Sequence, residues 1–99
     1  MLLRDKDHKE IVRLAKESFK KPVKIWAYGS RVNGMAHEGS DLDLVVIPDG
    51  YDQVDLGEVL TIKDLLQESS IPILVQVLDW NRIPDSFREN ILKEYEVVL

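Results

Sequence analysis

Two aspartates, Asp41 and Asp43, lie two residues apart in the run Asp-Leu-Asp-Leu-Val-Val-Ile. The composition of this run predicts a strand, and alternation along a strand places both carboxylates on one face. Neighbouring carboxylates repel each other unless a cation lies between them. A hard divalent ion such as Mg²⁺ is usually held by one or two carboxylates together with substrate phosphates. We therefore predict that Asp41 and Asp43 bind Mg²⁺ and are catalytic. The alternative is a pair of solvated carboxylates on a half-exposed strand.

A glycine-serine turn precedes the aspartate pair, separated from it by the spacer 31–40. The apolar run 25–28 predicts a strand that ends at Gly29. Glycine lets a backbone approach a ligand closely, and the N–H groups and hydroxyl of such a turn can hold phosphate oxygens. We predict that Gly29 and Ser30 bind the phosphates of a nucleotide. Arg31 either leans toward the same phosphates, crosses to a partner, or is a surface charge. A phosphate-binding turn facing paired carboxylates is the arrangement needed for metal-assisted nucleotidyl transfer.

Alternating helical and strand periodicities surround this site and predict one layered α/β domain over residues 1–99, in the order αβαβαβα. The second predicted strand is apolar on both faces, which favours an interior place in the sheet. The last predicted helix begins at Pro84, and we expect it to bury Ile83, Phe87, Ile91 and Tyr95. The other predicted elements are helices at 8–19 and 54–68, one or two helical turns after Ser30, strands at 23–28, 41–47 and 71–78, and a short edge strand at 97–99.

Composition excludes several classes of protein. The chain has no cysteine, so a disulfide framework and thiolate metal sites are excluded. A formal charge of −5 argues against extensive nucleic-acid binding, which needs a clustered basic face. No stretch approaches the roughly 20 apolar residues of a membrane span, and the charged start is unlike a secretory signal. We expect a cytoplasmic protein whose small core makes an oligomer or a permanent partner unsurprising.

Gly29-Ser30, the spacer and Asp41-Leu42-Asp43 together resemble the signature of the polymerase-beta-like nucleotidyltransferase superfamily. Further segments are similar to the minimal nucleotidyltransferases, which are catalytic domains of about this length. The segments that carry this similarity are Trp26-Ala27-Tyr28-Gly29-Ser30-Arg31-Val32, Ser40-Asp41-Leu42-Asp43-Leu44, Leu78-Asp79-Trp80 and Phe87-Arg88-Glu89. The resemblance implies a nucleotidyltransferase fold with a small mixed sheet, and a domain that binds ATP or another NTP with Mg²⁺. It also implies the antitoxin of a pair whose toxin is a HEPN-domain protein encoded nearby, with transfer of AMP to a tyrosine of that toxin in some members.

Gln76 is the departure from the family pattern. The resemblance implies a third carboxylate on the third strand, but the corresponding run here is Val-Gln-Val-Leu-Asp-Trp over residues 75–80. A carboxylate at this position helps to bind metal and accepts the proton of the attacking hydroxyl. Glutamine can offer an oxygen but cannot take a proton near neutral pH. Asp79 is an odd number of residues away and should face the opposite side of the strand. Some other carboxylate, such as Glu38, would have to swing in to substitute for the missing one.

Three functions follow from these residues. The first is an Mg²⁺-dependent enzyme that binds ATP and transfers AMP to a hydroxyl of the partner toxin. The second is a catalytically impaired nucleotide-binding module, disarmed at Gln76, that neutralises the partner by binding it. General-base catalysis contributes typically 10²–10⁴-fold, so the loss of one base can reduce activity without removing it. Modification of a small molecule ranks last, because 99 residues leave no room for a second domain that shapes an acceptor pocket.

Overall fold

The structure is a computed structural model that describes residues 1–37 and 39–99. The elements are α1 (Asp5–Ser18), β1 (Val23–Tyr28), α2 (Ser30–Asn33), β2 (Leu42–Pro48), α3 (Leu56–Glu68), β3 (Val75–Asp79), η1 (Trp80–Arg82), α4 (Asp85–Lys93) and β4 (Glu96–Val97). The predicted order of helices and strands is confirmed. Among the elements of the described residues, only the 3₁₀ helix η1 was not foreseen from the sequence. The third strand is shorter than predicted and begins at Val75.

The four strands form one mixed sheet in the order β3-β2-β1-β4. Strand β1 pairs antiparallel with β2 and with β4, whereas β2 and β3 are parallel. Strand β2 therefore lies between two partners, as its two-sided apolar pattern predicted. Leu42, Leu44 and Val46 are each at most 1% exposed, so the strand that carries Asp43 is anchored in the core.

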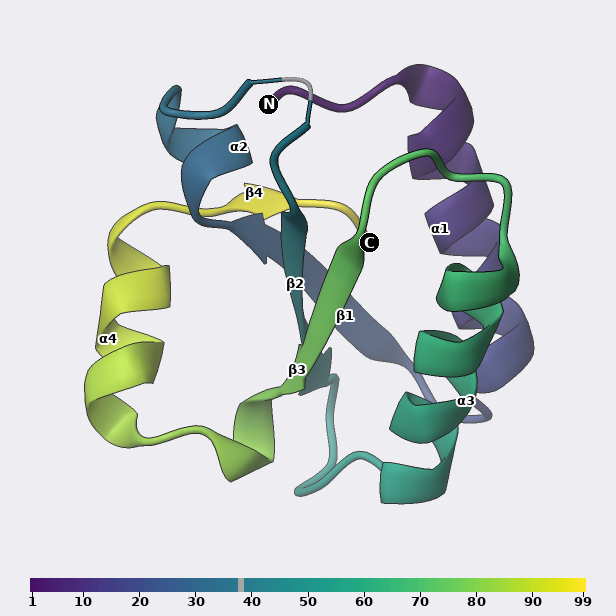
Figure 1. Ribbon diagram of the computed structural model, residues 1–99. Coiled ribbons are helices and arrows are strands. Elements are labelled where there is room, and N and C mark those ends of the chain that lie inside the picture. The colour runs from purple at the N-terminus through teal and green to yellow at the C-terminus, as the bar shows by residue number, and fades with distance from the viewer. Residues whose placement is uncertain (38) are drawn as a thin grey trace.

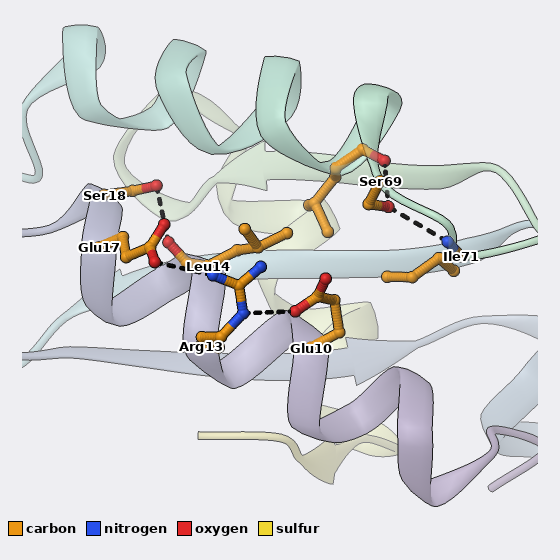
Figure 2. A network of polar contacts seen from close by, with 8 residues as sticks. Glu10, Arg13, Leu14, Glu17, Ser18, Ser69 and Ile71 are labelled. Atoms are coloured by element: carbon orange, nitrogen blue, oxygen red, sulfur yellow. Dashed lines mark hydrogen bonds and ion pairs between the residues drawn. The ribbon is translucent and has the colours of Figure 1, made fainter.

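Helices α1 and α3 lie side by side and cover one face of the sheet (Figure 1). Helix α1 is amphipathic, with Ile11, Leu14 and Ala15 buried and with Arg13 on its solvent side bonded to Glu10 and Glu17 (Figure 2). The helix starts three residues earlier than predicted. The buried core between helices and sheet consists of Ile11, Leu14, Ala15, Phe19, Ile25, Ala27, Leu42, Leu44, Val46, Val54, Val59, Ile62, Leu66, Ile71, Val77 and Val98.

Helix α4 lies on the other side of the sheet (Figure 1). Its predicted buried stripe is wrong in part, because only Ile91 is buried while Phe87 and Tyr95 are each 38% exposed. Their rings lie against aromatic rings of β1 instead: Phe87 meets Tyr28 edge to face, and Tyr95 stacks on Trp26 with centroids 4.0 Å apart. On this face of the sheet, aromatic side chains of α4 and of the segment after it therefore contact aromatic side chains of β1.

Among the described residues, no helix combines the length and the apolar character that crossing a membrane requires.

Candidate nucleotide and metal site

Three side chains form a row across the sheet at one end of its α4 face. Tyr28 on β1 is the register partner of Asp43 on β2, and Asp43 is the register partner of Gln76 on β3. Residues directly opposite each other in paired strands point to the same face. Asp41 immediately precedes β2 and is exposed. The structure thus brings both predicted metal ligands and the predicted third position together at one end of the strands, on the α4 face of the sheet.

Gly29 shapes the backbone next to Asp43. Its φ of 81° and ψ of −155° fall in a region that only glycine adopts readily. A Cβ at this position would lie 2.7 Å from Oδ2 of Asp43, so the missing side chain is what lets the carboxylate rest against the chain. The Gly29 carbonyl accepts hydrogen bonds from the amides of Val32 and Asn33, both at 3.0 Å. The predicted turn therefore opens a short helix, α2, whose first residue is Ser30.

Burial and like charge determine the electrostatics of the row. Partial burial raises the pKa of the Asp43 carboxyl, and the nearby charge of Asp41 adds to this effect. Burial, followed by the charge of Asp43, raises the pKa of the Tyr28 phenol to about 12, so this phenol is neutral at physiological pH. A cation held between the two carboxylates would relieve their repulsion. Two carboxylates fit a hard divalent ion that draws its remaining oxygens from a substrate.

Gln76 is bonded to the aspartate pair. Its Nε2 donates a hydrogen bond to Oδ2 of Asp41 at 3.1 Å, so an amide N–H faces the oxygen that a cation would use. Turning the amide over would present its oxygen to the same place. In the part of the chain that the structure describes, no three His, Cys, Asp or Glu side chains gather closely enough to bind a metal. Among the described residues, the metal donors brought together here are the carboxylates of Asp41 and Asp43 and the side-chain amide of Gln76.

Asp79 does not join the site. It is 7% exposed while Gln76 is exposed, so the prediction that these two side chains face opposite sides of β3 is confirmed. The Asp79 carboxylate accepts a hydrogen bond from the backbone N–H of Asn81 and forms an ion pair with Arg82 at 3.3 Å. It caps the N-terminus of η1. Glu38, the other substitute carboxylate, lies outside the described residues.

Arg31 is placed unlike a surface charge. It is 5% exposed, its Nε donates to the Ser40 carbonyl at 2.8 Å, and its Nη1 donates to the Leu2 carbonyl at 2.6 Å. Because Ser40 directly precedes Asp41, the bond from Nε to the Ser40 carbonyl helps to hold the backbone that carries the first carboxylate. Arg31 also lines a cavity of about 550 Å³ formed largely by residues 1–4. We assign it a positioning role, and its predicted contact with nucleotide stays a prediction.

A smaller cavity of about 200 Å³ adjoins the row and was missed by sequence reasoning. It includes Tyr28 and Gly29, and it is completed by Asn33, Phe87, Asn90, Ile91 and Glu94. Most of these residues belong to the α4 segment, which is far from the Gly-Ser turn in sequence. The one signal in the sequence is that Asn33 follows Ser30 by three residues, the spacing that places two residues on one side of a helical turn.

The comparison with known families agrees with this geometry. Residues 9–99 match the family described as Polymerase beta, Nucleotidyltransferase. The chain belongs to this nucleotidyltransferase family. The resemblance drawn from the sequence is thereby confirmed, together with the fold that it implied.

Individual proteins that resemble this nucleotidyltransferase chain are consistent with the family assignment. It is 40% identical over 74 residues to a probable protein adenylyltransferase, MntA, from Haemophilus influenzae, and the aligned part covers 75% of this chain and 63% of that relative. The crystal structure of a toxin–antitoxin with AMP-PNP superposes with a TM-score of 0.76 at 19% identity, covering 94% of this chain and 73% of the other. A mutant of the toxin–antitoxin MntA–HpeT gives a TM-score of 0.74 at 17% identity, with 93% and 72% covered. At these identities the two structures demonstrate a shared fold.

Proposed function

We propose that this chain is an antitoxin that binds ATP with Mg²⁺ and transfers AMP to a hydroxyl of a partner protein, a HEPN-domain toxin, in the cytoplasm. The observation that carries the proposal is the row of Tyr28, Asp43 and Gln76, with Asp41 beside it and the Gly29-Ser30 turn against Asp43. Further support comes from the likeness to a probable protein adenylyltransferase and to toxin–antitoxin structures, one of which contains AMP-PNP. The assembly would contain at least the toxin and this chain.

The acceptor oxygen attacks the α-phosphorus of ATP, the bond from that phosphorus to the bridging oxygen breaks, and pyrophosphate leaves with the electron pair. The hydroxyl proton passes to water or to a base. A bound divalent ion would neutralise charge on the phosphates and orient them. Asp41 and Asp43 would hold that ion, and the Gly29-Ser30 turn would hold the outer phosphates. Preorganised charges of this kind supply most of the rate in phosphoryl chemistry.

Gln76 favours a second candidate function, a binding module without turnover. The Gln76 amide cannot take up the proton of the attacking hydroxyl. In the structure its N–H, and not its oxygen, faces Asp41. Such a module would keep the metal–nucleotide site and neutralise the toxin by covering it. The two functions differ in one measurable respect, the covalent state of the partner.

The test is intact-mass analysis of the toxin encoded beside this chain, incubated with ATP and Mg²⁺. It uses the natural chain, Gln76→Asp, and Gln67→Asp as a control that adds the same charge on the exposed surface of α3. Restoring a carboxylate is expected to raise transfer by about 10²–10⁴-fold, the usual contribution of a general base. Gln67→Asp should behave like the natural chain.

Each outcome assigns the function. AMP added by the natural chain establishes the enzyme. AMP added only by Gln76→Asp establishes a disarmed site and a protein that acts by binding. If neither adds AMP while the two proteins still co-purify, the transferase proposal is wrong.

A further inference from the structure

The two ends of the row differ in what they offer a cation. At the β1 end, Oδ2 of Asp43 lies against Gly29, only 2.7 Å from where a Cβ of that residue would be. At the other end, Gln76 is exposed on β3, the edge strand of the sheet. There its Nε2 donates a hydrogen bond to Oδ2 of Asp41 at 3.1 Å. A carboxylate therefore faces the glycine turn, whereas the group that meets Asp41 at the β3 end is an uncharged amide.

The acceptor chemistry of a carboxylate determines how the Gln76 amide is turned. An ionised carboxylate only accepts hydrogen bonds, so the amide presents its N–H to Asp41 and directs its oxygen elsewhere. Turning the amide over would break a bond to a charged group, which is one of the stronger kinds of hydrogen bond. It would also set two oxygens against each other. One oxygen of Asp41 is thus occupied by a donor where an ion shared with Gln76 would need it.

A second divalent ion requires more negative charge than these side chains supply. Where a site holds two divalent ions, they lie ~3.5–4 Å apart, so bridging anions must offset their repulsion. One ion shared by Asp41 and Asp43 meets two negative charges, which its own charge balances. On the Gln76 side, an ion would meet an Asp41 oxygen that is already bonded and an amide in place of a carboxylate.

We propose that Gln76 limits this site to a single divalent ion, which Asp41 and Asp43 share with the nucleotide phosphates. The inference rests on the proposed function for the presence of metal and nucleotide, and it adds the number of ions. Gln76 acts here as a positioning residue, because its N–H holds Asp41 and its amide supplies no charge for a second ion. This differs from the role that the family resemblance implies for the position, where a carboxylate helps to bind metal.

Counting the bound ions tests this inference without any measurement of transfer. The probe is Mn²⁺ together with the ATP analogue that has a methylene group between its α- and β-phosphates and therefore cannot release pyrophosphate. Native mass spectrometry counts the Mn²⁺ ions in the complex of the chain with this analogue. Electron paramagnetic resonance reports separately whether two Mn²⁺ ions are coupled magnetically, as a pair ~4 Å apart would be.

The natural chain is expected to hold one Mn²⁺ per bound analogue and to give the spectrum of an isolated ion. Gln76→Asp and the isosteric Gln76→Glu both replace the amide with a carboxylate. At least one of them should bind a second ion and give a coupled spectrum. Gln67→Asp adds the same charge on the exposed surface of α3 and should keep a single ion.

Three results would overturn the inference: two coupled ions in the natural chain, a single ion in both Gln76 variants, or a second ion in Gln67→Asp. All three leave AMP transfer to the toxin standing, since the mass of the toxin reports it separately. A natural chain that binds no Mn²⁺ with the analogue would contradict this inference and the proposed metal–nucleotide site together. Because Gln76 is exposed, its variants are expected to fold, and circular dichroism of each one verifies this.

Discussion

The two faces of the sheet are built from different chemistry. The face under α1 and α3 is a continuous apolar cluster, and its members on β2 are at most 1% exposed. The face toward α4 carries aromatic pairs at its middle and Tyr28, Asp43 and Gln76 at one end. One face gains stability by excluding water. The other keeps partly exposed polar groups, and these are the groups that could hold a substrate.

Strand β2 shows how one segment serves both purposes. Because successive side chains alternate, Leu42 and Leu44 enter the core while Asp43, between them, points to the α4 face. The burial that fixes the strand also raises the pKa of Asp43. The buried neighbours of Asp43 thus hold its carboxylate in place, and the same burial disfavours its charge, which a bound cation would stabilise.

The largest expected effect contrasts two leucines on the two faces. Leu44→Ala should lower the free energy of unfolding by about 2–5 kcal/mol, because it leaves a cavity in the core. Leu78→Ala, on the α4 face of β3 and only partly buried, should cost clearly less. Urea unfolding of both variants gives the two values. Equal losses would mean that the α4 face is packed as tightly as the core.

A smaller effect contrasts two glycines, Gly29 directly after β1 and Gly50 after the end of β2. Gly29→Ala and Gly50→Ala both place a side chain at a positive φ, of 81° and 90°, which costs of order 1–3 kcal/mol. Only the Cβ at Gly29 would meet the Asp43 carboxylate, since nothing lies within 4 Å of the one at Gly50. Gly29→Ala should therefore also weaken Mg²⁺-dependent ATP binding by roughly 10–100-fold, the usual cost of disturbing the support of a ligand.

Calorimetry measures the ATP affinity of the two glycine variants at a temperature where both are folded. Both variants share the backbone strain, whereas only Gly29→Ala disturbs the Asp43 carboxylate. Equal nucleotide affinity in Gly29→Ala and Gly50→Ala would show that Asp43 does not need the space beside Gly29.

The smallest effect concerns pH and Tyr28. Its phenol has a pKa raised from 10.0 to about 12, by burial and then by the charge of Asp43. The folded state thus favours the neutral phenol, so the stabilisation is complete below pH 10 and is lost as pH rises toward 12. The melting temperature of the natural chain relative to Tyr28→Phe should be constant below pH 10 and fall above it. A difference that stays constant over this range would contradict the assigned environment.

Local pattern was enough to predict that the strands exist and that the aspartates form a pair, although β3 begins later than predicted, at Val75. Period-two alternation fixes the shared face of Asp41 and Asp43 without any tertiary information, and it also placed Asp79 away from Gln76. The mixed sheet came from the family resemblance. The starts of helices were less accurate, because α1 begins at Asp5, where Arg4 pairs with the buried Asp7 at 2.9 Å.

Long-range contacts were beyond the sequence. Nothing near Arg31 indicates that its guanidinium would meet the carbonyls of Leu2 and Ser40, since carbonyls are present at every residue. The cavity beside Tyr28 depends on the placement of α4, some sixty residues along the chain. The bond from Gln76 to Asp41 likewise requires the parallel pairing of β2 with β3.

The interior position of β2 has a consequence for dynamics. Its backbone amides and carbonyls are hydrogen-bonded to strands on both sides, so exposing them to solvent requires the sheet to open as a whole, at a free energy close to that of global unfolding. The carboxylate of Asp43 is therefore attached to an interior strand, whose amides we expect to exchange slowly with solvent. Any conformational change of the site would have to occur in the elements around it, while the backbone at Asp43 stays in place.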